Sequence, residues 1–304
     1  MSKVNSRLGA WAALIAGIVF GVNSNVVKVA NNTGLTTLDL LIYQFGFAIL
    51  YFIGKFLFAN KRNSISQPYM SLIKNPYNWI AGITTVLTGL FYYNSIQLTD
   101  PSIASLGLFQ YPWILFLFGI LFNKELVVGK HIVAIILLWM GTFLLIGGTL
   151  AHVTVPGLLY GFAAGLSFAT NLFSLQKITD HPFTKVFIFL IATIMVLVFC
   201  FGQYEKLHLF TADALSFGFI TAILGQIIAF ELLSYAAKNV SSVMMATLTT
   251  TELPVAMLLT WFIWGPIPNV MRISGLAIMV IAILWLKFEQ SRSVTVSIKK
   301  EVSS

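Results

Sequence analysis

Two stretches of similar pattern decide the fold: "LGAWAALIAGIVFGVNSN" at residues 8–25 and "PGLLYGFAAGLSFATNLF" at residues 156–173. Both are apolar and rich in small residues, and both carry an asparagine near the end. An offset of 148 positions aligns glycine with glycine, phenylalanine with phenylalanine and asparagine with asparagine: Gly17 with Gly165, Phe20 with Phe168, and Asn23 with Asn171.

A second pair of stretches follows the first in the same order. Residues 104–122, "ASLGLFQYPWILFLFGILF", resemble residues 246–264, "ATLTTTELPVAMLLTWFIW". An offset of 142 positions aligns Gln110 with Glu252 and places a proline two residues after each. The small change of offset needs only loops of different length, so the two matches predict an internal repeat.

Composition places most of this chain in a membrane. Of its 304 residues, 58% are hydrophobic and 9% are charged, whereas a soluble domain carries about 25% charged residues. With so little charge, most of the surface cannot face water, and we expect an integral membrane protein. The single cysteine, Cys200, excludes an intrachain disulfide and a cysteine-based metal cluster.

Long apolar runs predict the membrane-crossing segments. About 20 apolar residues in an α-helix cross the hydrocarbon core of a bilayer, and Pro, Gly and charged residues separate runs of that length here. The predicted spans are approximately residues 8–30, 36–58, 77–97, 100–122, 129–150, 154–176, 183–203, 213–236, 240–264 and 270–288. The fold class is therefore all-α integral membrane, with ten transmembrane helices.

The basic residues indicate which helix ends face the cytoplasm. With the N-terminus inside, only Lys28, Lys206 and Arg272 among the 18 Lys and Arg residues lie on or toward the outside. Since Lys and Arg concentrate in cytoplasmic segments, we predict a multi-pass protein of the cell membrane with both termini in the cytoplasm. The net charge of +8 is then a signal of topology and requires no nucleic-acid partner.

Two repeats of five helices have a geometric consequence. Because five is odd, the second repeat enters the bilayer from the opposite side, which gives two inverted five-helix repeats. Such repeats are typical of secondary transporters, whose sites lie near the midplane where the halves meet. The predicted domains are residues 1–150 and 151–290, one repeat each, followed by a cytoplasmic tail at residues 291–304.

Four polar side chains fall at repeat-related positions inside predicted helices: Asn23, Gln110, Asn171 and Glu252. Lipid penalises such groups, so they are candidates for function. A pseudo-twofold axis would bring them toward one central cavity, and we expect them to bind the substrate there. The alternative is hydrogen bonding between helices, which contributes about 0.6 kcal/mol per bond on average.

Glu252 is the strongest candidate, because a charge at the bilayer centre costs about 2.5–3.5 kcal/mol on insertion scales. We expect it to line the cavity and to hold an amine-bearing substrate in one state and a proton in another, which couples the two movements. Pro254 lacks an N–H group, so we also expect a freed carbonyl near Thr250 to help bind substrate. The alternative is a structural acid paired with another helix.

Two further charged residues, Lys28 and Glu231, are candidates for gating or coupling alongside Glu252. Lys28 falls near the outer end of the first predicted helix, and Glu231 falls nearer the cytoplasmic end of the eighth. The alternative for Lys28 is snorkelling to the interface. The alternative for Glu231 is an ion pair with Lys238, two turns along the same helix face.

Three segments resemble the EamA-type drug/metabolite transporter superfamily, and the resemblance covers nearly the whole chain. They are "FGVNSNVVKVA" at residues 20–30, "LFQYPWILFLFGILFNKELVVGKHIVAIILLWMGTFLLI" at residues 108–146, and "TELPVAMLLTWFIWG" at residues 251–265. In one departure, Gln44 stands where the family often has Arg. The resemblance implies a central cavity walled by helices one to four and six to nine, with the fifth and tenth at the periphery. It also implies movement of small metabolites, commonly outward.

The sequence contains no metal-ligand spacing, P-loop or dinucleotide fingerprint, so we expect neither enzyme activity nor a cofactor. We expect a secondary transporter that exports an amino-acid-like or amphipathic metabolite by alternating access, with a small-molecule substrate, the lipid bilayer and protons as partners. One alternative is exchange or uptake of a phosphorylated or sugar-like metabolite, which needs cationic anchors, and Lys28 is the one at hand. The other alternative is a membrane protein that does not transport.

Overall fold

A computed structural model describes residues 3–60, 69–99, 104, 107–126, 129–146, 154–201, 207, 211–265 and 269–285, and all regular structure in these residues is helical. Six helices among them are long and apolar enough to cross a membrane: Asn5–Asn32, Thr37–Phe58, Val155–Leu175, Thr184–Phe201, Ala212–Asn239 and Ser242–Ile263. The chain is therefore a multi-pass membrane protein. The total of ten spans stays a prediction, because parts of residues 100–128 and all of 147–153 lie outside the described residues, as does the predicted tail.

The first half of the chain forms a run of helices. They are α1 (Lys3–Asn32), α2 (Thr37–Asn60), the short α3 (Met70–Lys74), α4 (Pro76–Leu98), α6 (Tyr111–Asn123) and α7 (Gly129–Ile146). Local chemistry sets some of these boundaries. For example, Asn75 accepts a hydrogen bond from the backbone N–H of Tyr77 at 3.0 Å, and Pro76 starts α4 without needing a donor.

The second half repeats this plan. Its helices are α8 (Val155–Leu175), α9 (Thr184–Phe201), α10 (Ala212–Thr221), α11 (Ala229–Asn239), α12 (Ser242–Thr249), α13 (Glu252–Trp264) and Val270–Trp285. A π-helical segment, η2 (Ala222–Ile228), joins α10 to α11 in one continuous rod. Thr154, Thr211 and Ser241 cap α8, α10 and α12 by accepting backbone hydrogen bonds.

The helix contacts are symmetric: exchanging the two halves of the chain turns one set of contacting helix pairs into the other. α1 packs on α11 as α8 packs on α4, α1 packs on α13 as α8 packs on α6, and α2 packs on α10 as α9 packs on α4. The contact of α2 with α9 joins a helix to its own counterpart, and α6 packs on α12, the helix that directly precedes its counterpart α13. Exchanging the two halves therefore reproduces the same set of helix pairs, which is the packing expected of a two-repeat architecture.

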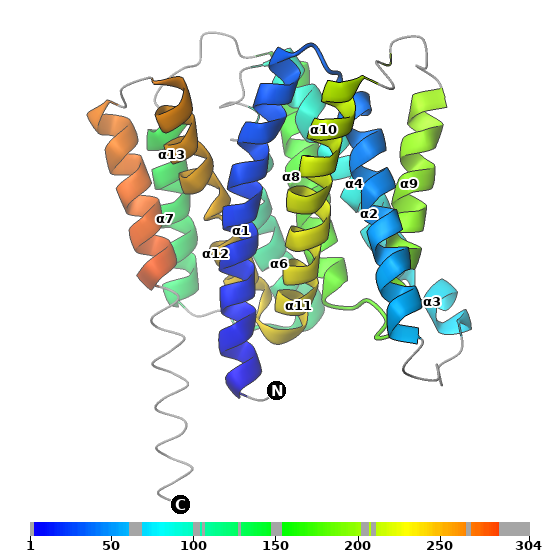
Figure 1. Cartoon of the computed structure of the whole chain (residues 1–304). Helices are drawn as coiled ribbons and strands as arrows, with labels where there is room; N and C mark the ends of the chain where they lie inside the picture. Colours follow the sequence, from blue (N-terminus) through cyan, green and yellow to red (C-terminus); the bar gives the residue numbers. More distant parts are fainter. Residues whose placement is uncertain are drawn as a thin grey trace, which may run out of the picture.

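The two repeats run in opposite directions. Gly9, near the start of α1, lies against Asn239 at the end of α11. Gln176, just after α8, donates a hydrogen bond to the hydroxyl of Ser242 at 3.1 Å, at the start of α12. The start of α1 and the end of α8 therefore lie at the same end of the bundle, and the two helices are antiparallel. The helix Val270–Trp285 also finishes at the end where α1 begins (Figure 1).

Two glycines show that the alignment of the repeats holds in three dimensions. A Cβ added at Gly17 would lie 2.7 Å from the carbonyl oxygen of Thr249, and one at Gly165 would lie 2.8 Å from that of Gly107. The offset of 142 positions that aligns Gln110 with Glu252 also aligns Gly107 with Thr249. Equivalent glycines thus touch equivalent carbonyl groups, and each contact needs a residue without a side chain.

The fifth helix of each repeat stands apart from the others. α7 and Val270–Trp285 lie beside one another at one edge of the bundle (Figure 1). Gly141 permits their close approach, since a Cβ there would lie 2.9 Å from the carbonyl oxygen of Gly275. These two helices are peripheral, as the family resemblance implies.

Candidate functional site

Two helices are interrupted at equivalent positions near the centre of the bundle. Residues 250–251 form a turn between α12 and α13, and residues 109–110 form a turn directly before α6. Each turn precedes a helix whose first turn contains a proline, Pro112 or Pro254. Discontinuous helices of this kind expose backbone groups at membrane depth and form the binding sites of many secondary transporters.

A cavity of about 430 Å³ lies beside the break between α12 and α13. The residues of α1 that line it lie between Phe20 and Asn31, in the C-terminal half of that helix. Nearer the start of α1, Gly9 and Gly17 pack closely against α11 and α12. The cavity therefore approaches one end of the bundle, while close packing fills the other end.

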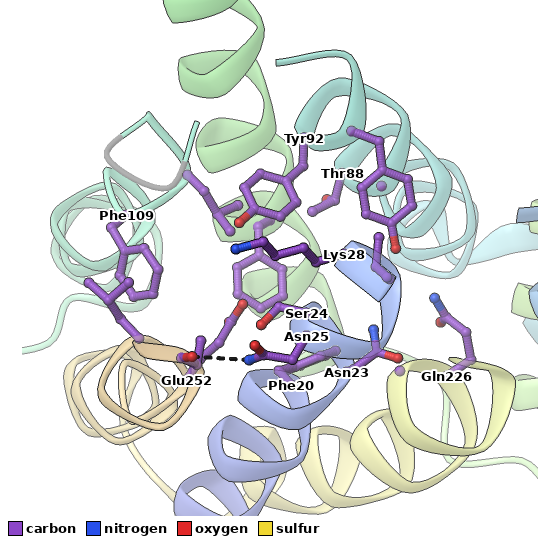
Figure 2. Close-up of a pocket in the computed structure, with 18 of the residues that line it drawn as sticks. Phe20, Asn23, Ser24, Asn25, Lys28, Thr88, Tyr92, Phe109, Gln226 and Glu252 are labelled. Carbon is purple, nitrogen blue, oxygen red and sulfur yellow. Dashed lines mark hydrogen bonds between the residues drawn. The ribbon is translucent and has the colours of Figure 1, made fainter. Parts of the chain in front are cut away.

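Side chains from both repeats face this space. Figure 2 shows Asn23, Asn25 and Lys28 projecting from α1, Tyr92 from α4, and Glu252 from the start of α13. Lys28 extends into the middle of the space that the others surround (Figure 2). Of the six residues singled out by the sequence, Asn23, Lys28, Asn171 and Glu252 line the cavity.

Glu252 is buried, with a relative exposure of 9%. It occupies the first turn of α13, where the positive end of the helix dipole favours a negative group. No hydrogen bond or ion pair to its carboxylate occurs among the described residues. A carboxylate held in that way at a cavity wall can accept a proton or a cation that enters the cavity.

The carbonyl group of Thr250 is not free, contrary to the expectation raised by Pro254. It accepts a hydrogen bond from the backbone N–H of Leu253 at 3.2 Å. The three hydroxyl groups at the break are also used locally, because Thr249, Thr250 and Thr251 each donate to a backbone carbonyl oxygen three or four residues earlier. The tight turn thus compensates for the donor that proline lacks, and Glu252 remains the main chemical group at this break.

Asn23 and Gln44 bring two amide groups to the wall near Gly225. Asn23 Oδ1 and Gln44 Oε1 are buried and have no hydrogen-bond partner among the described residues. A Cβ at Gly225 would lie 2.9 Å from Gln44 Nε2 and 3.0 Å from Asn23 Nδ2, so the glycine leaves room for both. Since buried polar atoms in proteins are normally paired, these two oxygens are ready acceptors for donors on a ligand.

Asn171 lines the cavity but is already engaged. Its Nδ2 donates to the carbonyl oxygen of Ala81 at 3.0 Å and to the hydroxyls of Thr84 and Thr85 at 3.1 and 2.8 Å. These bonds tie α8 to α4. The repeat-related Asn23 has no such network around its oxygen, so the alternative of interhelical hydrogen bonding describes Asn171 better than Asn23.

Gln110 and Glu231 do not line the cavity. Gln110 Oε1 accepts a hydrogen bond from Trp113 Nε1 at 3.0 Å, in the turn before α6. Glu231, in α11, forms ion pairs with Lys55 from α2 and Lys185 from α9. Lys238, the partner considered from the sequence, instead pairs with Asp180 at 3.0 Å.

The cavity contains residues that the sequence did not single out as a site. They are chiefly Asn25, Gln44, Gln226 and Arg272. Gln226 belongs to η2, and π-helical segments occur frequently at functional sites. Arg272 lies in the first turn of the peripheral helix Val270–Trp285, and its Nε is buried without a hydrogen-bond partner among the described residues. The signal available for Arg272 was the predicted topology, which made it one of three basic residues on or toward the outside.

Phe20 and Phe168 meet edge to face, with ring centroids 6.0 Å apart and an interplanar angle of 85°. Both rings line the cavity, and they occupy equivalent positions of the two repeats. A pair made of a residue and its own counterpart lies where the pseudo-twofold axis passes. The cavity therefore reaches the axis that relates the two halves, and these two rings line it there.

Two antiparallel repeats, two interrupted helices and a polar cavity between the halves define a membrane transporter of the inverted-repeat class. Residues 7–147 and 155–288 each match the EamA-like transporter family. The chain belongs to that family, whose members are transporters.

Two other comparisons bear on the fold and on relatives. A protein of known crystal structure aligns over 100% of both chains with a TM-score of 0.70 and 17% sequence identity. At that identity the likeness concerns the fold alone. No curated protein sequence matches the chain.

Proposed function

We propose that this protein is a secondary transporter that exports a small amino-acid-like or amphipathic metabolite across the cell membrane by alternating access. The observation that carries the proposal is the buried carboxylate of Glu252, which lines a cavity at the break between α12 and α13. With ten spans and cytoplasmic termini, the end of α1 is external, and the cavity faces outward. Transport then requires the packed end to open while the cavity end closes around the contact between Phe20 and Phe168.

Protons are the coupling ion in this proposal. Glu252 exchanges a proton for the amine of the substrate, since one carboxylate satisfies one of them at a time. Moving the halves between outward and inward states while Glu252 carries one or the other links the two fluxes. Asn23 and Gln44 supply further acceptor oxygens at the cavity wall near Gly225.

Flux in proteoliposomes tests this function. Purified protein is reconstituted with and without an imposed pH gradient, and uptake of a mixture of radiolabelled amino acids is followed. We expect gradient-driven accumulation by the parent and its loss in Glu252→Gln, which keeps size and hydrogen bonding but cannot titrate. Asp213→Asn is the matched control, because Asp213 is an exposed acid at the start of α10. Accumulation equal to the parent in Glu252→Gln would rule out the coupling role.

A second candidate function gains support from Arg272. The sequence offered only Lys28 as an anchor for a phosphorylated metabolite, but Arg272 also lines the cavity. Two cations suit a phosphate group, since guanidinium and ammonium groups are its usual ligands. Counterflow of labelled glucose 6-phosphate by the same proteoliposomes would favour this exchanger, whereas amino-acid flux alone would exclude it.

A further inference from the structure

The charged groups of the cavity are arranged at different depths. Glu252 lies at the break between α12 and α13, and Lys28 and Arg272 line the same space. The side chains of Leu41, Leu253 and Met257 provide an apolar wall in the same cavity. The distance between the acid and the bases sets the shape of any ligand that contacts both.

The position of a residue along α1 indicates its depth in the cavity relative to Glu252, because α1 runs alongside α13. A Cβ at Gly21 would lie 2.6 Å from the carbonyl oxygen of Glu252, and Asn25 Nδ2 donates to the carbonyl oxygen of Ala256 at 3.0 Å. The two helices therefore rise together toward the mouth. Lys28 lies two turns beyond Gly21, which is about 10 Å along the helix at a rise of 1.5 Å per residue.

Arg272 lies toward the mouth, because the helix Val270–Trp285 starts at the end of the bundle opposite to the start of α1 (Figure 1). Its backbone N–H donates to the carbonyl oxygen of Asn269 at 3.1 Å, so it belongs to the first turn after the connection from α13. The last residue of α13, Trp264, is about 18 Å beyond Glu252 by the same helical rise. The side chain of Arg272 lines the cavity from the helix Val270–Trp285, so its guanidinium group lies nearer the mouth than the Glu252 carboxylate at the break.

We propose that the cavity recognises a molecule with an amine at one end and an acidic group at the other, joined by a chain. The amine binds Glu252 at the inner end, and the acidic group binds Arg272 near the mouth. An α-amino acid carries both groups on one carbon atom and reaches only one anchor, whereas an ω-amino acid or a short peptide reaches both. This inference rests on the proposed function, since it names the substrate class of the same cavity.

The two anchors differ in the chemistry they offer. The guanidinium group of Arg272 matches the planar fork of a carboxylate and can donate two hydrogen bonds to it. Its Nε is buried without a partner among the described residues, so a ligand acid would satisfy a donor that is otherwise unpaired. Glu252 provides the complementary acceptor for an ammonium group at the break between α12 and α13.

A series of ligands of increasing length tests the proposal by binding alone. Isothermal titration calorimetry in detergent would compare the affinities of alanine, 4-aminobutyrate, 6-aminohexanoate and 8-aminooctanoate. Hexylamine and hexanoate are the controls, since each carries only one of the two charged groups. We expect the best of the longer amino acids to bind at least about tenfold more tightly than alanine, the effect of one added charge-assisted hydrogen bond. Its affinity should also exceed the affinities of hexylamine and hexanoate, which carry one charge each. Equal or tighter binding of alanine would overturn the proposal.

Two variants assign the ends of the ligand. In Arg272→Gln, 6-aminohexanoate should lose its advantage over hexylamine, and in Glu252→Gln it should lose its advantage over hexanoate. Lys74→Gln serves as the control, since Lys74 is exposed at the far end of the bundle. Arg272 lies in the first turn of a peripheral helix, so its variant keeps the test open even if Glu252→Gln fails to fold. An unchanged advantage in Arg272→Gln would contradict the assignment.

The binding series separates this inference from the proposed function. A length preference without flux in proteoliposomes would support the charge spacing and contradict transport. Flux of α-amino acids without any preference for the longer ligands would support transport and contradict the charge spacing.

Discussion

Gly17 in α1 lies directly against Thr249 at the end of α12, where a Cβ would come within 2.7 Å of the threonine carbonyl oxygen. The repeat places Gly165 in the same relation to Gly107, at 2.8 Å. These two contacts hold the interrupted helices against the first helix of the opposite repeat. The contact at Gly17 also reaches Glu252, whose backbone nitrogen would lie 3.2 Å from the same Cβ.

Alanine at either glycine should therefore destabilise the protein. Gly17→Ala and Gly165→Ala each force backbone apart, and overpacking of this kind costs about 1–3 kcal/mol. Gly46→Ala is the control, because nothing lies within 4 Å of a Cβ there, and alanine favours a helix over glycine. Thermal unfolding in detergent would show lower midpoints for the first two and an unchanged or higher one for the third. Tolerance of Gly17→Ala would argue against the close contact.

The two repeat-related asparagines should respond differently to substitution. Asn171→Ala removes the hydrogen bonds from α8 to Ala81, Thr84 and Thr85 of α4, and each such bond contributes about 0.5–1.5 kcal/mol. Asn23→Ala removes an oxygen that has no partner among the described residues, so it should fold normally and lose flux. Thermal midpoints and flux per folded molecule separate the two effects. Equal losses of stability would show that Asn23 is also structural.

The orientation in the membrane can be tested with cysteines at described, exposed positions. In a Cys200→Ala background, Asn32→Cys should react with a membrane-impermeant thiol reagent on intact cells, and Lys74→Cys should not. Both side chains are exposed, and they belong to opposite ends of the bundle. Permeabilised cells, in which both should react, provide the control. Labelling of position 74 alone on intact cells would reverse the predicted topology.

Glu231 joins three helices at the packed end of the bundle through Lys55 and Lys185. We expect Glu231→Gln to weaken that closure and to reduce the outward-open population. The ratio of outward-open to inward-open protein should fall by about fivefold for a loss of about 1 kcal/mol, so labelling of Ser24→Cys in the cavity from outside should slow. Asp180→Asn breaks the pair with Lys238 at a side chain that is 97% exposed and should leave the rate unchanged. Parent-like labelling of the Glu231→Gln protein would exclude a gating role.

Much of the fold could be predicted because composition and repetition both leave strong marks in the sequence. A chain with so few charges must lie in a membrane, and close packing admits only glycine at positions such as 17 and 165. The same constraint acts on both repeats, so the offset could be found from the residue pattern. The antiparallel arrangement then follows from an odd number of helices in each repeat.

The site could be predicted only in part, because the repeats are equivalent in sequence but occupy different conformations. Glu252 lines the cavity, whereas its counterpart Gln110 is held by Trp113 outside it. The repeat makes the two positions equivalent, so the sequence does not indicate which of them lines the cavity. Arg272 was not predicted as a cavity residue for another reason. Its helix is peripheral along most of its length, and only the first turn reaches the cavity.

The contact between Phe20 and Phe168 joins two equivalent residues of the two repeats. In the alternating access proposed above, exchanging the conformations of the two repeats would turn each ring into the other, so the pair would map onto itself in both the outward and the inward state. The same two rings would then separate the two sides of the membrane throughout the cycle. The helices on either side would move around this aromatic pair, and a substrate would pass it in both states.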